Sequence, residues 1–113
     1  MGTLQSSGYH IHFYCDVEQI PLCREIREKL LQEVPEIEGA GSVRNAPIGP
    51  HPVPMFEAWF GNPSLDPVLR WAMENRRGLS VMIHPISGDD LVDHRDHSIW
   101  LGKPLPLRLE IFD

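Results

Sequence analysis

Six histidines among 113 residues are the part of this sequence best suited to chemistry. Histidine is the commonest protein ligand for metal ions and the side chain that most readily moves protons near neutral pH. His10 and His12 lie in residues 9–14, a stretch rich in aromatic and β-branched side chains that predicts a strand. Both imidazoles are expected on one face of this strand, about 7 Å apart. Such a pair more often forms a hydrogen-bonded polar face than a metal site. Evidence for a metal site must therefore come from residues elsewhere in the sequence.

Two further predicted strands supply polar groups for the same face. Residues 53–60 alternate between an apolar face and a face that carries Glu57. Residues 79–84 alternate in the same way, with His84 on the second face. If these strands flank residues 9–14, the candidate metal ligands gather on one face of three adjacent strands: His10, His12, His84 and Glu57.

This set of side chains indicates a metal site. Two or three imidazoles with one carboxylate are the ligands of non-haem Fe(II) oxygenases, and a close variant binds catalytic zinc. We therefore expect Fe(II), with zinc or another divalent ion as the alternative. His12 and His84 rank first as ligands because their strands are expected to be neighbours. The alternative interpretation of Glu57 is a solvent-facing strand residue.

The other three histidines suit acid and base catalysis. His94 and His97 are three residues apart in residues 91–97, which predict one or two helical turns, so both are expected on one side. Each follows an aspartate that could orient a neighbouring group. His51 lies in residues 45–52, a loop that three prolines stiffen. The alternative interpretation of residues 91–97 is a solvated charged turn.

Helices and a fourth strand must position these groups. Apolar residues spaced by three and four predict helices over residues 20–34, closed by Pro35, and over residues 65–73. The first helix is capped by Asp16 or by Gln19. A weaker strand is expected over residues 36–44, because two glycines interrupt it.

The resulting order, βαββαβ, predicts the fold. It is typical of an α+β, ferredoxin-like arrangement, with one antiparallel sheet and both helices on one face. The strand at residues 9–14 is then central, between residues 53–60 and residues 79–84. The apolar side chains expected under the helices are Ile11, Phe13, Phe56, Phe60, Val81 and Ile83.

The opposite face of this sheet is expected to be uncovered and partly apolar. It would expose Tyr14, Met55, Trp59 and Met82. Monomers seldom expose a contiguous apolar patch of this size. We therefore predict a homodimer or a higher homo-oligomer.

Composition restricts the remaining possibilities. A length of 113 residues with 42% apolar residues fits a single domain over residues 1–113. A formal net charge of −6 without a basic stripe disfavours nucleic-acid binding. Residues 1–8 lack a signal-peptide pattern and no apolar run reaches membrane-spanning length, so we expect a cytoplasmic protein without membrane contact. Cys15 and Cys23 are expected to be reduced thiols.

Three segments resemble the DOPA 4,5-dioxygenase family. They are Tyr-His-Ile-His-Phe-Tyr at 9–14, Gly-Pro-His-Pro with Met-Phe-Glu after it at 49–57, and the His-Pro and Asp-His-Arg-Asp-His motifs at 78–102. The resemblance implies a ferredoxin-like fold and iron(II)-dependent extradiol cleavage of a catechol such as L-DOPA by dioxygen. It also implies functional roles for all six histidines. The chain departs from many relatives at Arg44 and Asn45, where they carry a further histidine.

Two readings without this reaction stay open at this point. One is a non-catalytic, dimeric ferredoxin-like module that binds a metal or a small molecule, since this fold hosts unrelated functions. The other is a structural dimer whose surface histidines trap zinc. Both predict metal or ligand binding without oxygen consumption.

Overall fold

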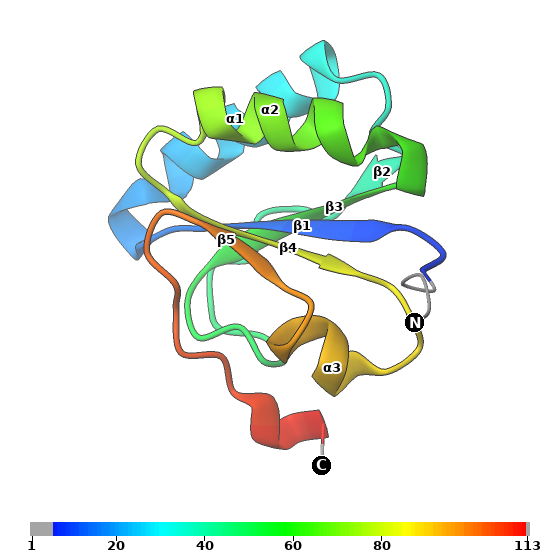
Figure 1. The fold of residues 1–113 in the computed structure, drawn as a ribbon. Helices are drawn as coiled ribbons and strands as arrows, with labels where there is room; N and C mark the ends of the chain where they lie inside the picture. Colours follow the sequence, from blue (N-terminus) through cyan, green and yellow to red (C-terminus); the bar gives the residue numbers. More distant parts are fainter. Residues whose placement is uncertain (1–5, 113) are drawn as a thin grey trace.

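A five-stranded antiparallel sheet organises residues 6–112, the part of the chain that the computed structural model describes (Figure 1). The strand order is β2-β3-β1-β4-β5, so β1 lies between β3 and β4. The predicted ferredoxin-like α+β arrangement is therefore confirmed, and β5 extends the sheet beside β4. The strands are β1 (Tyr9–Tyr14), β2 (Gly39–Ala40), β3 (Met55–Phe60), β4 (Ser80–Pro85) and β5 (Ile99–Leu101).

Helices α1 (Ile20–Glu33) and α2 (Leu65–Asn75) cover one face of this sheet (Figure 1). A 3₁₀ turn precedes α1, and Gln19 is the N-cap residue of the helix while its side-chain oxygen accepts a hydrogen bond from the Asp16 amide at 3.0 Å. Both predicted cap residues therefore act at this helix start. The six apolar side chains predicted to lie under the helices are at most 1% exposed and belong to one core cluster: Ile11, Phe13, Phe56, Phe60, Val81 and Ile83.

The predicted second strand is much shorter than expected. Of residues 36–44, only Gly39 and Ala40 form a strand, and the chain rejoins β3 at a single bridge between Arg44 and Met55. Glycines weaken a strand because they have high conformational entropy and no side chain to pack. The predicted third strand also begins two residues late, at Met55, because the preceding Pro54 has no N–H to continue the ladder.

The face opposite α1 and α2 is covered by the chain itself. Helix α3 (Asp90–Arg95) and the C-terminal segment lie below the sheet in Figure 1. Tyr14, Met55 and Met82 are at most 5% exposed, in a cluster packed against side chains that include Trp100 and Leu105. The prediction that these three residues lie exposed is wrong, because the irregular C-terminal segment folds back over them.

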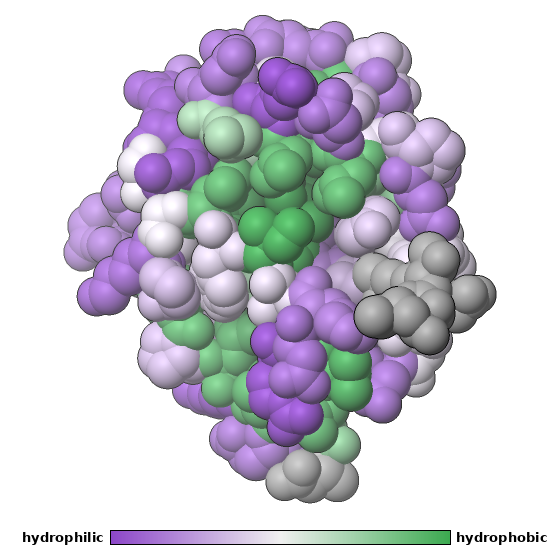
Figure 2. Space-filling view, in the orientation of Figure 1, coloured by the Kyte–Doolittle hydropathy of each residue, from purple (hydrophilic) through white to green (hydrophobic). Residues whose placement is uncertain are grey.

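This covering removes the reason for expecting an oligomer through that face. Trp59 is half-buried, so it does not by itself make an apolar patch. In the view of Figure 2, apolar side chains instead reach the surface between α2 and the edge strand β5. Met73 of α2 and Ile99 of β5 are among the large apolar residues that are exposed. The oligomeric state stays a prediction.

Two further expectations from the sequence can be compared with the structure. Cys15 and Cys23 are both free thiols, as predicted, and both are buried. Within residues 6–112, no helix combines the length and the apolar character needed to cross a bilayer.

Candidate metal centre

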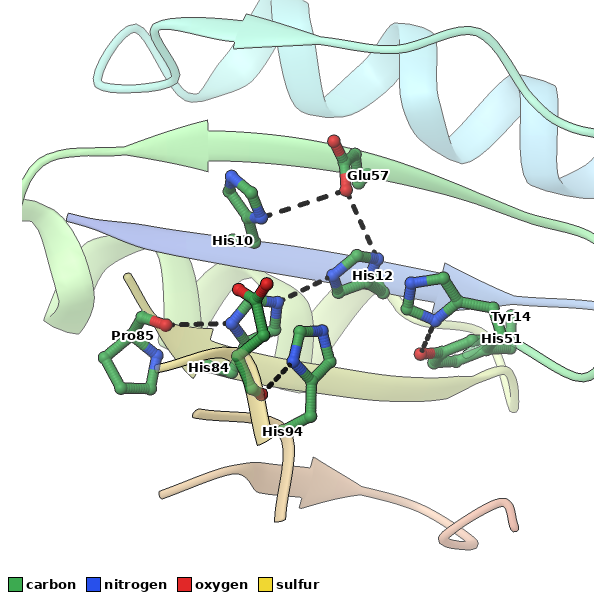
Figure 3. A network of polar contacts seen from close by, with 9 residues as sticks. His10, His12, Tyr14, His51, Glu57, His84, Pro85 and His94 are labelled. Atoms are coloured by element: carbon green, nitrogen blue, oxygen red, sulfur yellow. Dashed lines mark hydrogen bonds and ion pairs between the residues drawn. The ribbon is translucent and has the colours of Figure 1, made fainter. Parts of the chain in front are cut away.

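Five of the six histidines converge on the sheet face opposite α1 and α2 (Figure 3). His10 and His12 come from β1, and His84 comes from the neighbouring strand β4, directly opposite His10 in the register. His51 comes from the loop before β3, and His94 comes from α3. Segments far apart in the sequence therefore supply one cluster.

Two groups of three histidines within this cluster are close enough to hold a metal ion. One group is His10, His12 and His84, and the other is His12, His51 and His94. In each group, the potential ligand nitrogens lie within 4.8 Å of one another. His12 belongs to both groups, so it is the centre of the cluster. The structure thus brings together the three histidines that the sequence analysis named as ligands.

Glu57 lies beside this cluster and is not a member of either group. Its Oε2 atom is 3.8 Å from Nδ1 of His10 and 3.8 Å from Nδ1 of His12, because Glu57 pairs with His12 across β1 and β3. The carboxylate is 34% exposed. It can therefore support the positive charge of a bound cation from the rim of the site.

The spacing between His12 and His84 fits two ligands of one ion. Their Nε2 atoms are 3.0 Å apart. Two nitrogens that bind one ion at a right angle, each about 2.1 Å from it, lie about 3.0 Å apart. Nδ1 of His12 is the single buried side-chain nitrogen or oxygen without a hydrogen-bond partner among the described residues. If Nε2 of His12 binds an ion, Nδ1 carries the hydrogen and faces the Glu57 carboxylate 3.8 Å away, as the second N–H of a metal-ligating histidine commonly does, so the residues present fit a divalent metal.

Backbone carbonyls fix the tautomer of two of the histidines. Nδ1 of His84 lies 2.9 Å from the carbonyl oxygen of Pro85, and Nδ1 of His94 lies 2.7 Å from that of Asp90. A carbonyl oxygen only accepts, so each Nδ1 must carry the hydrogen. The Nε2 atom of each neutral ring then keeps its lone pair, as in metal-ligating histidines that donate their other N–H to a carbonyl.

His51 has a different kind of partner. Its Nδ1 lies 2.7 Å from the hydroxyl of Tyr14, and both side chains are buried. Burial raises the pKa of Tyr14 far above its usual value, so this residue stays a phenol. Among the described residues, the Tyr14 hydroxyl has no other hydrogen-bond partner, so its hydrogen goes to Nδ1 of His51. Nε2 of His51 then carries a hydrogen and is a donor.

Burial keeps His12, His51 and His84 neutral. It is the largest cause that lowers the pKa of His51 to about 4 and the pKa of His84 to about 3, and nearby histidines add to it. The pKa of His12 is lowered well below its usual value for the same reasons. Neutral imidazole is the form that binds metal ions.

A small cleft gives access to the histidines. Its volume is about 220 Å³, below the roughly 300–1,000 Å³ typical of drug-sized pockets. A single aromatic ring is therefore the size of ligand that fits. The lining residues are His10, His12, Pro50, His51, Glu57, His84, Pro85, Ile86, Asp90, Asp93, His94 and Phe112.

His97 lies outside this cluster. It is exposed and does not line the cleft, so the structure does not support the catalytic role expected from the sequence. Helix α3 ends at Arg95 with Asp96 as its C-cap residue, so His94 and His97 do not share a helical face. His94, by contrast, is buried in the cluster, with its ring centroid 4.0 Å from that of His84, and its role stays a prediction.

Tyr14 and Asp93 are two further polar residues of the site, and the sequence predicts an orienting role for Asp93 but no chemical role for Tyr14. Tyr14 shares the strand parity of His10 and His12, which was the signal available, but it was assigned to an apolar patch. Asp93 is buried and accepts a hydrogen bond from the Ser87 amide at 2.9 Å, so it fixes the turn before α3. It therefore helps to place His94 without contacting it through a hydrogen bond.

Comparisons with known proteins identify the family of this chain. A model of the "Dopa 4,5-dioxygenase family" matches residues 9–111. The chain belongs to the DOPA 4,5-dioxygenase family. The matched range contains every histidine of the cluster, so the resemblance found in the sequence is confirmed.

Two curated relatives share part of their length with this family member. An uncharacterized 21.2 kDa protein of Botryotinia fuckeliana is 37% identical over 119 residues, which cover 97% of this chain and 64% of that protein. The DOPA 4,5-dioxygenase of Amanita muscaria is 36% identical over 63 residues, which cover 56% of this chain and 28% of that enzyme. The chain thus spans less than two thirds of the length of both relatives.

A solved structure supports the family fold. The crystal structure of a candidate dioxygenase from Nostoc punctiforme superposes with a TM-score of 0.90 at 36% identity. The match covers 97% of this chain and 94% of the other. The arrangement of strands and helices is therefore shared over nearly the whole chain.

Proposed function

We propose that this member of the DOPA 4,5-dioxygenase family is a non-haem Fe(II)-dependent extradiol dioxygenase that cleaves the ring of a catechol such as L-DOPA between carbons 4 and 5. The observation that carries the proposal is the convergence of five histidines from separate segments around His12. Buried, neutral imidazoles at the bottom of a ring-sized cleft suit a metal-dependent reaction of an aromatic diol. Family membership supports the same reaction type.

We propose His12, His84 and His94 as the ligands, a set that takes one residue from each histidine group in addition to the shared His12. The Nε2 atoms of His12 and His84 are 3.0 Å apart, and carbonyl contacts leave Nε2 of His84 and His94 free to bind. His10 and Glu57 stand next in order, as neighbours of His12. Iron(II), when bound, supplies the redox chemistry that lets dioxygen react with an aromatic diol, whereas zinc supplies Lewis acidity alone.

His51 and His10 are the proposed general acid and general base. Nε2 of His51 carries a hydrogen that can be donated to an oxygen atom of the substrate inside the cleft. A catechol must also lose at least one proton when it binds a metal. His10 lines the cleft and is 30% exposed, so its imidazole offers that proton a route to solvent.

The test is anaerobic loading with Fe(II), followed by a panel of catechols and admission of oxygen. We expect oxygen consumption and a yellow ring-opened product with at least one catechol. Loading with zinc is the matched control and should give binding without oxygen consumption. Tight metal binding with no oxygen consumption across the panel would favour the non-catalytic binding module instead.

Other properties of the working protein stay predictions. They are a cytoplasmic location, assembly as a homodimer or higher oligomer, and the absence of nucleic-acid and membrane partners. Sedimentation of the metal-loaded protein measures the second of these, and a mass equal to one chain would contradict it.

A further inference from the structure

A second hollow adjoins the histidine cleft. Its volume is about 230 Å³, and it shares Pro50, His51 and Glu57 with the cleft as lining residues. A ring held at the histidines therefore has room to extend a substituent into this second hollow. The remaining lining residues are Gly41, Ser42, Arg44, Ile48, Gly49 and Met55.

Arg44 is the one lysine or arginine that lines either hollow. Arg44 and Met55 exchange two backbone hydrogen bonds: the Arg44 amide donates to the Met55 carbonyl at 2.7 Å, and the Met55 amide donates to the Arg44 carbonyl at 3.2 Å. Side chains of directly paired residues in antiparallel strands lie on the same face of the sheet. Met55 and Glu57 are two residues apart on β3 and also share a face. Arg44 therefore lies on the same face as the histidine cluster.

The position of Arg44 relative to the histidines is set by a loop that backbone hydrogen bonds hold in place. Residues 45–52 connect Arg44 to the site, and the Ile48 carbonyl accepts a hydrogen bond from the His51 amide at 3.0 Å. The Pro50 carbonyl accepts one from the Arg108 amide at 2.8 Å, which fastens the loop to the C-terminal segment. The distance between the backbone of Arg44 and the cleft is thus fixed by these contacts.

The Arg44 guanidinium is exposed and makes no ion pair or side-chain hydrogen bond with any residue in 6–112. Glu57 is the one acid that lines its hollow, and that carboxylate faces His10 and His12. The hollow thus holds a cation with open donors and no second carboxylate for an ammonium group. Arginine binds carboxylates through two parallel hydrogen bonds.

We propose that the Arg44 hollow binds a carboxylate substituent of the aromatic diol, an assignment that rests on the function proposed above. The substrate class is then catechols with a negatively charged side chain. The hollow therefore distinguishes substrates by the charge of this substituent. A substrate that carries the carboxylate needs no amino group next to it.

The experiment compares three catechols that differ in the charge of one side chain: dihydroxyphenylpropionate, ethylcatechol and dihydroxyphenethylamine. With the Fe(II)-loaded protein, we expect kcat/KM to be highest for the acid and lowest for the amine, with about tenfold between them. Arg44→Met should reduce the difference to about twofold or less, and Arg44→Glu should reverse the order. Arg44→Lys should keep the order with a smaller ratio, because lysine retains the charge without the planar fork.

Arg24→Met is the matched control. Arg24 is exposed on α1, on the other side of the sheet, and its replacement changes the net charge by the same amount. The preference for the acid should be unchanged in this variant. A loss of preference here as well would show that overall charge, and not Arg44, selects the substrate.

A binding measurement separates this inference from the proposed function. The acid is titrated anaerobically into the full chain, and the Arg44 Nε–H signal is followed by NMR. If no catechol supports oxygen consumption but Arg44→Met raises the Kd of the acid about tenfold, the proposed dioxygenase function is wrong and the carboxylate site at Arg44 is supported. Equal kcat/KM values for the acid and the amine, or an unchanged Kd for the acid in Arg44→Met, would show that Arg44 does not bind the carboxylate. Neither result would bear on the proposed dioxygenase function.

Discussion

The hydroxyl of Tyr14 lies 2.7 Å from Nδ1 of His51, and this contact makes His51 unlike the histidines around it. His84 and His94 each place Nδ1 against a carbonyl oxygen, which can only accept. The Tyr14 phenol has a hydrogen to donate instead. One side chain on β1 therefore distinguishes His51, the proposed proton donor, from His84 and His94, the proposed metal ligands.

Replacing Tyr14 by Phe removes that hydrogen and keeps the aromatic ring, which stacks on Trp100 at 5.7 Å between centroids. We expect metal binding within about twofold of wild type and turnover reduced by about tenfold or more, because His51 loses the partner that fixes its tautomer. The ¹⁵N chemical shifts of the His51 ring report the tautomer directly. A wild-type protein whose His51 carries its hydrogen on Nδ1 would contradict the assignment.

Replacing His12 by Ala should abolish metal binding, because His12 belongs to both histidine groups. We expect the Kd for Fe(II) or zinc to rise by more than about a hundredfold, measured by competition with a chelator. The thermal midpoint of the metal-free variant shows whether the fold survives. A folded variant with normal metal stoichiometry would refute the ligand assignment.

His97→Ala is the matched control for the cluster, since His97 is exposed and outside the cleft. It should leave metal binding and turnover within about twofold of wild type, as is usual for surface changes. The sequence alone favoured a slowed enzyme here. A large loss of turnover with metal retained would restore the role that the sequence suggested.

The metal-free protein should lose stability as the pH falls below neutrality. The folded-state pKa values of His51 and His84, about 4 and about 3, lie below the value of 6.5 for an unfolded histidine. Between those values the unfolded chain binds more protons, so stability is fully present above about pH 6.5 and declines toward pH 3. We expect a loss on the order of a few kcal/mol between pH 7 and pH 5, measured by urea unfolding. His97→Gln should show the same decline, and an equal free energy of unfolding at both pH values would contradict the buried neutral state.

Gly39 tests the short strand β2. A Cβ atom added at this position would collide with the indole of Trp59. Gly39→Ala should therefore destabilise the protein by about 1–3 kcal/mol, seen as a lower urea midpoint with an unchanged slope. Gly41→Ala is the control, because a Cβ there would meet nothing closer than 4.0 Å. Equal effects of the two changes would show that glycine entropy, and not the indole contact, matters here.

The sequence by itself determined strands β1, β3 and β4, the faces of these strands, and the family. Alternation along β1, β3 and β4 depends only on the two-residue period of a strand, so it placed His10, His12 and His84 on one face correctly. The periodic spacing of apolar residues likewise gave both helices and the core beneath them.

Only the tertiary structure decided what closes the site. The C-terminal segment has no periodic pattern, so nothing local revealed that it folds back over Tyr14, Met55 and Met82. The inward position of His94 and the outward position of His97 depend on where α3 ends, and the partner of His51 depends on how a proline-rich loop packs. Such contacts join residues far apart in the chain, and their energies depend on burial and distance, which a linear pattern does not contain.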